Sequence, residues 1–315
     1  MKPQVSIVIP TFCRPDRMKP VLDSVFAQKN IIAYVEVIIL DNDPKASAKD
    51  AVNQIIARGT RWPLIYGHEP NAGVANARNA GLVLAKGNLI AFLDDDETAT
   101  ENWLSELLKT QQATNADIVF GPVIGRLEQP APHQEYIEST FTRTGSDKSG
   151  IILKFFGCGN SMFSREKFFN EKQLFDPKTN EIGGEDCELF TRVEAKGAVF
   201  GWAAKAFVFE DIPPSRASLR YNLIKAFSFG QGPSQTAWQQ RKLAMLGFWM
   251  AVGLAQAIVY GLLAIPLWVL RHKTRAYIID RAAQGLGKLL WFRGFEPRFY
   301  GSFVLGAKVQ GTGSE

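Results

Sequence analysis

The stretch LIAFLDDDE, residues 89–97, joins five consecutive apolar residues to three consecutive aspartates. The runs IVI at 7–9 and VIIL at 37–40 are also apolar throughout, which is typical of parallel strands buried on both faces of a sheet. The predicted strands cover residues 5–10, 35–40, 64–67, 89–94 and 118–120, and the predicted helices cover 15–28, 46–58, 73–85 and 99–113. This alternation predicts an α/β fold, a mostly parallel sheet with helices on both faces.

The net charge of the chain comes from its C-terminal end. Residues 1–270 carry 28 basic and 28 acidic side chains, whereas residues 271–315 carry eight basic and three acidic ones, which accounts for the net charge of +5. A neutral main region is not expected to bind nucleic acid, and 46% hydrophobic residues exclude a disordered chain. Three cysteines without metal-ligand spacing indicate reduced thiols in the cytoplasm, and we expect no secretory signal.

Acidic residues follow two of the predicted strands, at the edge where ligands bind in open α/β sheets. The triplet DND at 41–43 follows the second strand, and DDD at 94–96 follows the fourth. Adjacent like charges are costly unless a positive group meets them, so the second triplet predicts a divalent cation, Mg²⁺ or Mn²⁺, held together with substrate phosphate oxygens. The alternative is an acidic loop that caps the helix beginning near residue 99.

Two further segments combine glycines with charged side chains. NAGVANARNAG, residues 71–81, joins a glycine-containing helix start to Arg78, which suits a phosphate or a base edge; an ordinary helix start with a surface arginine is the alternative. GGED, residues 183–186, precedes a predicted helix at 185–196. Asp186 would act there either as a helix cap or as a general base.

Five motifs occur in the order and spacing of one enzyme family. They are VSIVIPTFCRPDRM, VIILDNDP, NAGVANARNAG, LIAFLDDDE and GGEDCELFTRV. Over about residues 4–235 the chain resembles the family 2 glycosyltransferases, and the wider pattern is most similar to bacterial exopolysaccharide glycosyltransferases of the succinoglycan ExoM type. The resemblance implies a GT-A fold, a Rossmann-like sheet that binds a nucleotide sugar.

The resemblance also implies roles for individual residues. Asp96 would hold the metal ion, and Asp186 would be the catalytic base. Asn160 and Glu185 would lie on the acceptor side, and Lys225 would contact the diphosphate. The residues that border the donor would be Pro10, Thr11, Asp41, Arg78, Asp94 and Asp95, with Asp41 against the base.

One base and one cation site match the chemistry of an inverting transfer. A single displacement at the anomeric carbon needs a base for the acceptor hydroxyl and a Lewis acid for the departing diphosphate. A glycosidase would instead need a pair of carboxyl groups flanking the bond. Two positions depart from the family pattern. Phe209-Glu210 stands where a His-Glu pair is common, and Ser228 stands where a second basic residue often follows Lys225.

The C-terminal region has a different character. Residues 243–270 carry no formal charge and are long enough to cross a bilayer as one helix; a buried helical hairpin is the alternative. Residues 276–293 predict an amphipathic helix lying on anionic lipid, or a helix packed on the catalytic domain. Because basic residues on both sides oppose a full crossing, we expect a re-entrant segment broken near residues 261–266.

These predictions divide the chain into a catalytic domain, residues 1–235, and a membrane-associated helical tail, residues 236–315. Within the catalytic domain, residues 1–120 form the nucleotide-sugar half and residues 121–235 the acceptor half, with a long polar loop at 126–150. The expected enzyme is an inverting, metal-dependent hexosyltransferase at the cytoplasmic face of the inner membrane. It would move a sugar from a nucleotide sugar, UDP-glucose by resemblance, to a lipid-linked saccharide in exopolysaccharide or other surface-glycan synthesis. A sugar nucleotidyltransferase and a non-catalytic, membrane-anchored nucleotide-sugar-binding protein are the alternatives.

Overall fold

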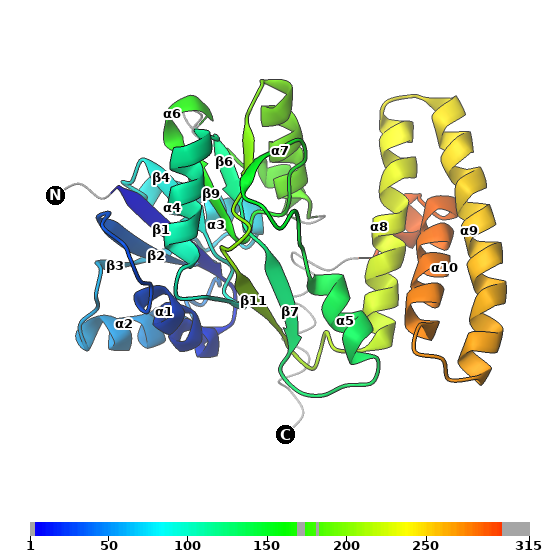
Figure 1. Cartoon of the computed structure of the whole chain (residues 1–315), viewed down its shortest axis with the longest axis horizontal. Helices are drawn as coiled ribbons and strands as arrows, with labels where there is room; N and C mark the ends of the chain where they lie inside the picture. Colours follow the sequence, from blue (N-terminus) through cyan, green and yellow to red (C-terminus); the bar gives the residue numbers. More distant parts are fainter. Residues whose placement is uncertain (1–3, 169–173, 181–182, 298–315) are drawn as a thin grey trace. The chain divides into compact units, whose positions relative to one another are not determined.

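The computed structural model describes residues 4–168, 174–180 and 183–297, which form two compact units (Figure 1). The first unit contains the described residues of 4–124 and 142–211, and the second contains residues 125–141 and 212–297. The boundary that we predict at residue 235 lies inside helix α8 (Leu219–Gln239), which belongs wholly to the second unit. The chain therefore contributes residues 125–141 to the second unit before it completes the first.

The main sheet of the first unit has eight strands among the described residues, in the order β3-β2-β1-β4-β9-β6-β10-β8. The strands that pair in parallel are β1 (Val5–Thr11), β2 (Val35–Asp41), β3 (Leu64–His68) and β4 (Leu89–Phe92), and also β6 (Ile118–Phe120) with β10 (Phe200–Trp202). Strand β9 (Ser161–Ser164) is antiparallel to β4 and β6, and β8 (Gly150–Ile152) is antiparallel to β10. The predicted α/β fold with a central sheet is confirmed.

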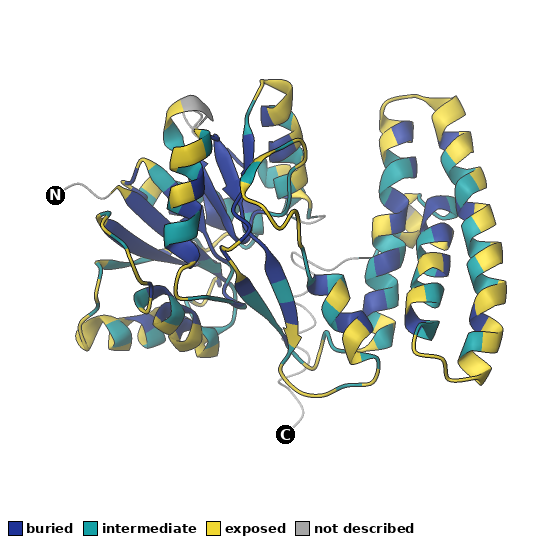
Figure 2. Ribbon diagram, in the orientation of Figure 1, coloured by how far each residue is buried: buried dark blue, intermediate teal, exposed yellow. Residues whose placement is uncertain are grey.

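Apolar side chains fill both faces of this sheet, so most of its strands are buried along their length (Figure 2). In β1, Ile7 and Ile9 belong to one core cluster and Val8 belongs to the other, because successive side chains point to opposite faces. Helices α1 (Met18–Phe26), α2 (Lys49–Ala57) and α4 (Trp103–Thr114) contribute to the first cluster, and α3 (Val74–Leu84) and α7 (Glu185–Ala195) contribute to the second. The remaining short helices are η1 (Pro15–Arg17), α6 (Arg165–Phe168) and η2 (Pro177–Thr179).

A second sheet of three strands lies beside the acidic triplet, in the order β5-β11-β7. Strand β5 (Glu97–Ala99) begins directly after Asp96 and pairs with β11 (Val208–Ile212), and β7 covers Val123–Leu127. Helix α5 (Gln134–Phe141) follows, so the prediction of a long loop at 126–150 is wrong there. The helix has only eight residues, too few for its buried side chains, Tyr136, Ile137 and Phe141, to show a clear period.

Three long helices form most of the second unit: α8, α9 (Leu243–Val269) and α10 (Arg275–Leu289), followed by η3 (Arg293–Phe295). Glycines let their backbones approach closely. A Cβ at Gly253 of α9 would lie 2.7 Å from the carbonyl oxygen of Gly285 in α10, and a Cβ at Gly230 of α8 would overlap the backbone of Gln284. Helix α10 therefore packs against both α8 and α9.

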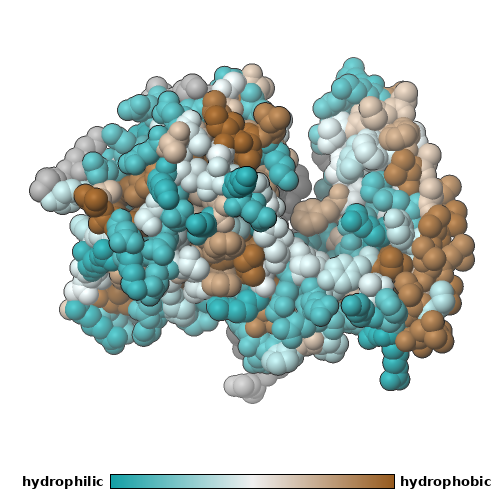
Figure 3. All heavy atoms as spheres, in the orientation of Figure 1, coloured by the Kyte–Doolittle hydropathy of each residue, from teal (hydrophilic) through white to brown (hydrophobic). Residues whose placement is uncertain are grey.

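Helix α9 differs from the predicted segment in one respect, because it is continuous from Leu243 to Val269. The break that we expect near residues 261–266 is absent, since Pro266 lies only one turn from the end of the helix and removes a single backbone hydrogen bond. Among the described residues, α9 is the one helix long and apolar enough to cross a membrane, and 11% of its most apolar window is buried. Figure 3 shows hydrophobic residues gathered over this helix.

Candidate active site

The acidic triplet meets a guanidinium group at the edge of the main sheet. Leu93 stays buried after β4, and the chain then turns through Asp94, Asp95 and Asp96 into β5. The Nη1 atom of Arg14 lies 2.6 Å from Oδ1 of Asp95 and 2.9 Å from Oδ2 of Asp96. One cationic side chain thus bridges two of the three carboxylates.

Burial dominates the electrostatics of Asp95 in this pair. Asp95 is buried, and the hydroxyl of Thr11 donates to its Oδ2 atom at 2.8 Å. Loss of water, together with the neighbouring charge of Asp96, raises the pKa of Asp95 to about 6, although Arg14 and Thr11 act in the opposite direction. The same two carboxylates raise the pKa of Arg14 against the effect of its own burial. This edge of the sheet therefore favours a bound positive charge.

A second guanidinium joins α3 to α7. Arg78 is 5% exposed; its Nη1 atom donates to Oε1 of Glu185, and its Nη2 atom lies 3.3 Å from Oδ1 of Asp94. The ring of Phe175 lies beneath the guanidinium carbon at 5.6 Å. Arg78, which we predict to contact the nucleotide, is thus bound by carboxylates in this structure, and Glu185 of the predicted acceptor side is its partner.

A third arginine, Arg143, lies near the same acidic residues. Its Nη2 atom is 3.3 Å from Oε1 of Glu97, which is almost fully buried. Burial, and then the charge of Asp94, raises the pKa of Glu97 well above its usual value, while Arg143 opposes this shift. Gly159 approaches so closely that a Cβ there would lie 2.5 Å from Oδ2 of Asp94. We call these residues together the acidic site cluster: Asp94, Asp95, Asp96, Glu97, Glu185 and Asp186, with Arg14, Arg78 and Arg143.

The carboxylate of Asp186 is held by backbone N–H groups. Its Oδ1 atom accepts from the backbone N–H of Cys187 at 2.7 Å, and its Oδ2 atom accepts from that of Cys158 at 3.4 Å. Gly184, with φ +83°, is the N-cap of α7, so Asp186 lies within the first turn and is not the cap residue. The capping alternative is therefore wrong for Asp186.

Side-chain amides hydrogen-bond to the backbone of the segment that enters α3. Asn42 accepts from the N–H of Gly73 at 2.6 Å and donates to the carbonyl oxygen of Asn71 at 2.9 Å. Oδ1 of Asn180 accepts from the N–H of Ala75 at 3.0 Å, in the first turn of the helix. The backbone N–H groups of Ala75 and Asn76, which begin α3, thus already have an acceptor in Asn180.

Asp41 is fully buried, and its carboxylate binds groups of its own unit. It accepts from the N–H groups of Asp43 and Ala48, at 3.1 and 2.8 Å, and from the hydroxyl of Tyr66 at 3.0 Å. These contacts shape the loop after β2. Contact between Asp41 and a base stays a prediction, as does the place of Pro10 at the donor.

Asn160 is also fully buried, with φ +53°. Its Oδ1 atom accepts from the indole N–H of Trp103 at 2.7 Å, and its Nδ2 atom donates to the carbonyl oxygens of Pro122 and Ala206, each at 2.8 Å. These bonds assign the side chain of Asn160 to the support of the loop before β9. Lys225 lies in the second unit, where its Nζ atom contacts the ring of Phe141 at 3.8 Å.

Sequence reasoning missed four of the charged or polar groups that surround the predicted residues. Arg14 had a signal, a basic residue three positions after Thr11 at the end of the first strand. Glu97 directly follows the aspartate triplet. Arg143 and Asn180 come from segments without a motif, and only the folded chain brings them to the site.

Fold and site together define an α/β protein whose acidic and basic side chains gather beyond the carboxyl ends of its central strands. The family model described as "Glycosyl transferase family 2" matches residues 6–169, more than half of the chain, and that of "Glycosyl transferase family group 2" matches residues 89–293. The chain belongs to glycosyl transferase family 2.

Individual relatives agree with this membership. The chain is 29% identical over 227 residues to the succinoglycan biosynthesis protein ExoM of Rhizobium meliloti, covering 72% of this chain and 73% of ExoM. It is 28% identical over 168 residues to the putative teichuronic acid biosynthesis glycosyltransferase TuaG of Bacillus subtilis, covering 53% and 64%. Among solved structures, the mannosyltransferase PcManGT of Pyrobaculum calidifontis, in complex with GDP-Man and Mn²⁺, aligns with a TM-score of 0.59 at 15% identity over 92% of this chain and 88% of that one. S. aureus TarS 1–349 aligns with a TM-score of 0.52 at 15% identity, over 96% and 99%. These structures share the fold.

Proposed function

We propose that the chain is an inverting, metal-dependent hexosyltransferase that uses a nucleotide sugar in the synthesis of a cell-surface polysaccharide. The observation that carries the proposal is the acidic site cluster. Asp95 and Asp96 share one cationic partner at the carboxyl ends of the strands, and Asp186 lies on a separate element, α7. One cation site and one separate base are what a single displacement at an anomeric carbon requires.

The residues present fit Mg²⁺ or Mn²⁺ held in part by substrate. The described residues contain no group of three His, Cys, Asp or Glu side chains that could hold a metal by themselves. Asp96, with Asp94 beside it, would supply carboxylate ligands, and diphosphate oxygens would supply the others. The contacts of Arg14 with Asp95 and Asp96 support a place for positive charge beside these carboxylates. When bound, the ion would offset the charge of the departing diphosphate.

Asp186 is the better candidate for the base than its neighbour Glu185. The Glu185 side chain is 11% exposed and is paired with Arg78, so its carboxylate is already bound and little exposed to an acceptor. Asp186 is more exposed and is held by backbone N–H groups, which fix its position but leave lone pairs on both oxygens. It would accept the proton of the acceptor hydroxyl as that oxygen attacks the anomeric carbon and the nucleoside diphosphate leaves.

Asp96→Ala tests the cation site. We expect it to abolish Mn²⁺-dependent binding of UDP in calorimetry, whereas Asp147→Ala, at an exposed position in a loop of the same unit, should bind like the parent. Equal Mn²⁺-dependent affinity in the parent and in a folded Asp96→Ala protein would refute the assignment.

Asp186→Asn tests the base. We expect it to keep donor binding and to lose transfer by about 10²- to 10⁴-fold, the usual contribution of a general base. Glu188→Gln is the matched control, because Glu188 lies in the same turn but pairs with Arg192. Near-normal transfer by Asp186→Asn would move the base elsewhere.

The donor and the reaction class need a direct assay. UDP-glucose is proposed as the donor from the family resemblance, and a lipid-linked saccharide is proposed as the acceptor. Nucleotide release from a panel of sugar nucleotides, with and without lipid-linked acceptor, separates the candidates. A transferase releases nucleoside diphosphate with acceptor, a nucleotidyltransferase releases pyrophosphate from nucleoside triphosphate, and a binding protein releases neither.

We further propose that α9 lies in the interface of the cytoplasmic face of the inner membrane. Its side chains leave a large apolar surface exposed, including Leu262, Ile265 and Val269. Because α10 packs along α9, a full crossing would carry charged residues such as Asp280 and Arg281 into hydrocarbon, which is costly. A helix in the plane of the interface keeps these charges near water.

Single cysteines at residues 242 and 274, at the two ends of α9, test this orientation. In a variant without native cysteines, both should resist a membrane-impermeant thiol reagent in intact cells and react after permeabilisation. Labelling of residue 274 alone in intact cells would show that α9 crosses the membrane.

A further inference from the structure

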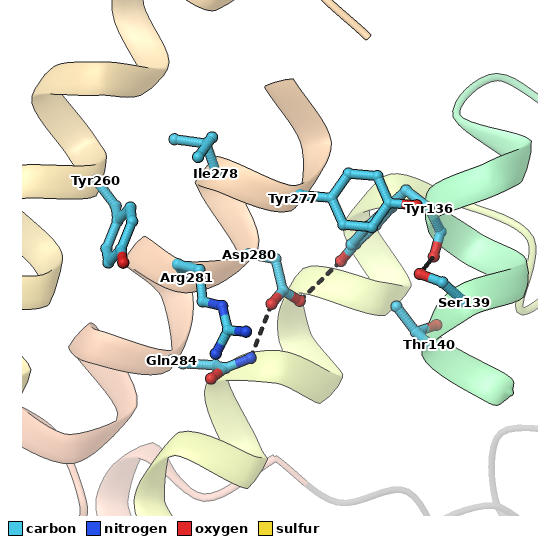
Figure 4. Close-up of a pocket in the computed structure, with 9 residues that line it drawn as sticks. All are labelled: Tyr136, Ser139, Thr140, Tyr260, Tyr277, Ile278, Asp280, Arg281 and Gln284. Atoms are coloured by element: carbon cyan, nitrogen blue, oxygen red, sulfur yellow. Dashed lines mark hydrogen bonds between the residues drawn. The ribbon is translucent and has the colours of Figure 1, made fainter. Parts of the chain in front are cut away.

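The second unit contains a cavity of about 350 Å³ outside the acidic site cluster (Figure 4). Helices α5, α9 and α10 all contribute to its lining, and all three belong to this unit. The volume lies near the lower end of the range for sites that bind small molecules. The chemistry of the lining indicates what the cavity would hold.

Three tyrosines supply aromatic surface from three different helices. Tyr136 of α5 and Tyr277 of α10 meet edge to face, with ring centroids 5.3 Å apart and an interplanar angle of 81°, and Tyr260 comes from α9. Tyr277 is 38% exposed, so part of its ring is open to a ligand. Aromatic faces are electron-rich and apolar, and they stack well against the C–H groups of a sugar ring.

The polar groups of the cavity are already oriented. Oδ2 of Asp280 accepts from the hydroxyl of Tyr136 at 2.9 Å, and its Oδ1 atom accepts from Nε2 of Gln284 at 2.8 Å. Figure 4 shows this chain of bonds, with Arg281 beside it. The cavity thus presents a fixed carboxylate, an amide and a guanidinium, which together can donate to and accept from hydroxyl groups.

Charge distinguishes a sugar from a phosphate as the ligand. Asp280 and Arg281 carry opposite charges, so their sum in the cavity is zero, and a phosphate would meet the carboxylate of Asp280. A neutral ligand rich in hydroxyl groups meets no such repulsion. Tyr260 also places the cavity beside α9, whose apolar surface we propose to lie in the membrane interface.

From this arrangement we propose that the cavity binds a neutral sugar ring of a membrane-borne glycolipid, as a site for a sugar of the lipid-linked acceptor other than the one that reacts at Asp186. The identification of the ligand as a lipid-linked acceptor rests on the proposed function. The recognition of a sugar ring rests on the cavity alone.

Vesicle flotation of the full chain tests the proposal, with a glucosyl diacylglycerol as the probe. Three sets of vesicles of equal surface charge contain the glucosyl lipid, the same lipid without its sugar, or phosphatidic acid in place of other anionic lipid. We expect the parent to bind the glucosyl vesicles about tenfold more tightly than the sugar-free ones, the effect of one or two well-placed hydrogen bonds.

Variants locate the effect in the cavity. Tyr277→Ala and Gln284→Ala should remove the preference for the glucosyl lipid, Tyr277→Phe should retain it, and Tyr34→Ala, an exposed tyrosine of the first unit, should leave it unchanged. Circular dichroism checks that each variant is folded. Arg281→Gln alters an exposed side chain, and we expect it to weaken the preference for the glucosyl lipid.

Three results would overturn the proposal. The first is that the parent shows no preference for the glucosyl lipid. The second is that all of the folded cavity variants keep the parent's preference. The third is a gain with phosphatidic acid that depends on Tyr277, which would indicate a phosphate site. Mn²⁺-dependent UDP affinity, measured on the same proteins, separates this failure from failure of the proposed function, because it depends on the first unit.

Discussion

Replacing Arg78 by methionine should destabilise the first unit strongly. The guanidinium is buried, pairs with Glu185 and Asp94, and lies over the ring of Phe175. Removing one partner of a buried ion pair costs about 3–5 kcal/mol, because the other charge stays buried without compensation. The Asp94 side chain is 32% exposed and can be hydrated, so most of the loss comes from Glu185. We expect the free energy of unfolding to fall by about 3–4 kcal/mol.

A double-mutant cycle measures how much of this loss belongs to the pair. Urea unfolding, followed by far-ultraviolet circular dichroism, is recorded for Arg78→Met, Glu185→Gln and the double variant. Because the double variant leaves no buried charge at this position, we expect a coupling energy of at least about 1.5 kcal/mol. Arg58→Met, at an exposed helix end, is the control and should stay within about 0.5 kcal/mol of the parent. A loss below about 1 kcal/mol in Arg78→Met, or no coupling, would show that the guanidinium does not hold α7 to α3.

Three further predictions concern single side chains. Asn160→Ala should lower the free energy of unfolding by about 3–5 kcal/mol in a denaturant titration, because it leaves buried hydrogen-bonding groups unpaired and places alanine at positive φ. Alkylation of the folded protein should modify Cys187 and spare Cys158, since burial raises the pKa of the Cys158 thiol and hides its sulfur; equal rates would contradict the structure. The folded-state pKa of Asp95, about 6, lies above its ordinary value. The ionised carboxylate therefore lowers the free energy of unfolding, increasingly from about pH 4 to pH 6 and fully above pH 6. Cation-dependent UDP affinity should fall as the pH drops below 6, because Asp95 then loses its charge. Asp95→Asn should flatten this pH dependence in calorimetry.

The parts of the fold that the sequence predicts are those encoded locally. Strands β1, β2 and β4 each contain a continuous apolar run, and their parallel order follows from the helices between them. Strand β9 has four residues and inserts antiparallel between β4 and β6, a placement that no local pattern signals. Helix α9 continues past Pro266, because a proline near a helix end removes only one hydrogen bond. The presence of a proline therefore does not by itself predict the break that we expect near residues 261–266.

In the candidate site, too, some residues have a local sequence signal and others are brought together only by folding. The aspartate triplet and Asp186 stand out because each follows a recognisable strand or glycine pair. Their cationic partners do not stand out, because Arg14 reaches Asp95 across more than eighty residues and Arg78 reaches Glu185 across more than a hundred. Which charges meet is decided by strand order and helix packing, and these properties belong to the folded chain.

The contribution of residues 125–141 to the second unit bears on how the chain folds as it is synthesised. Helix α5 leaves the ribosome well before α8 and α10, with which it shares the second unit. Its buried residues, Tyr136, Ile137 and Phe141, therefore lack their partners in the second unit until the ribosome has completed the first unit. A nascent chain stalled before residue 212 would leave these three side chains of α5 exposed to chaperones. A fragment that ends at residue 235 would lack Ala276 of α10, which packs in the same cluster as these three residues.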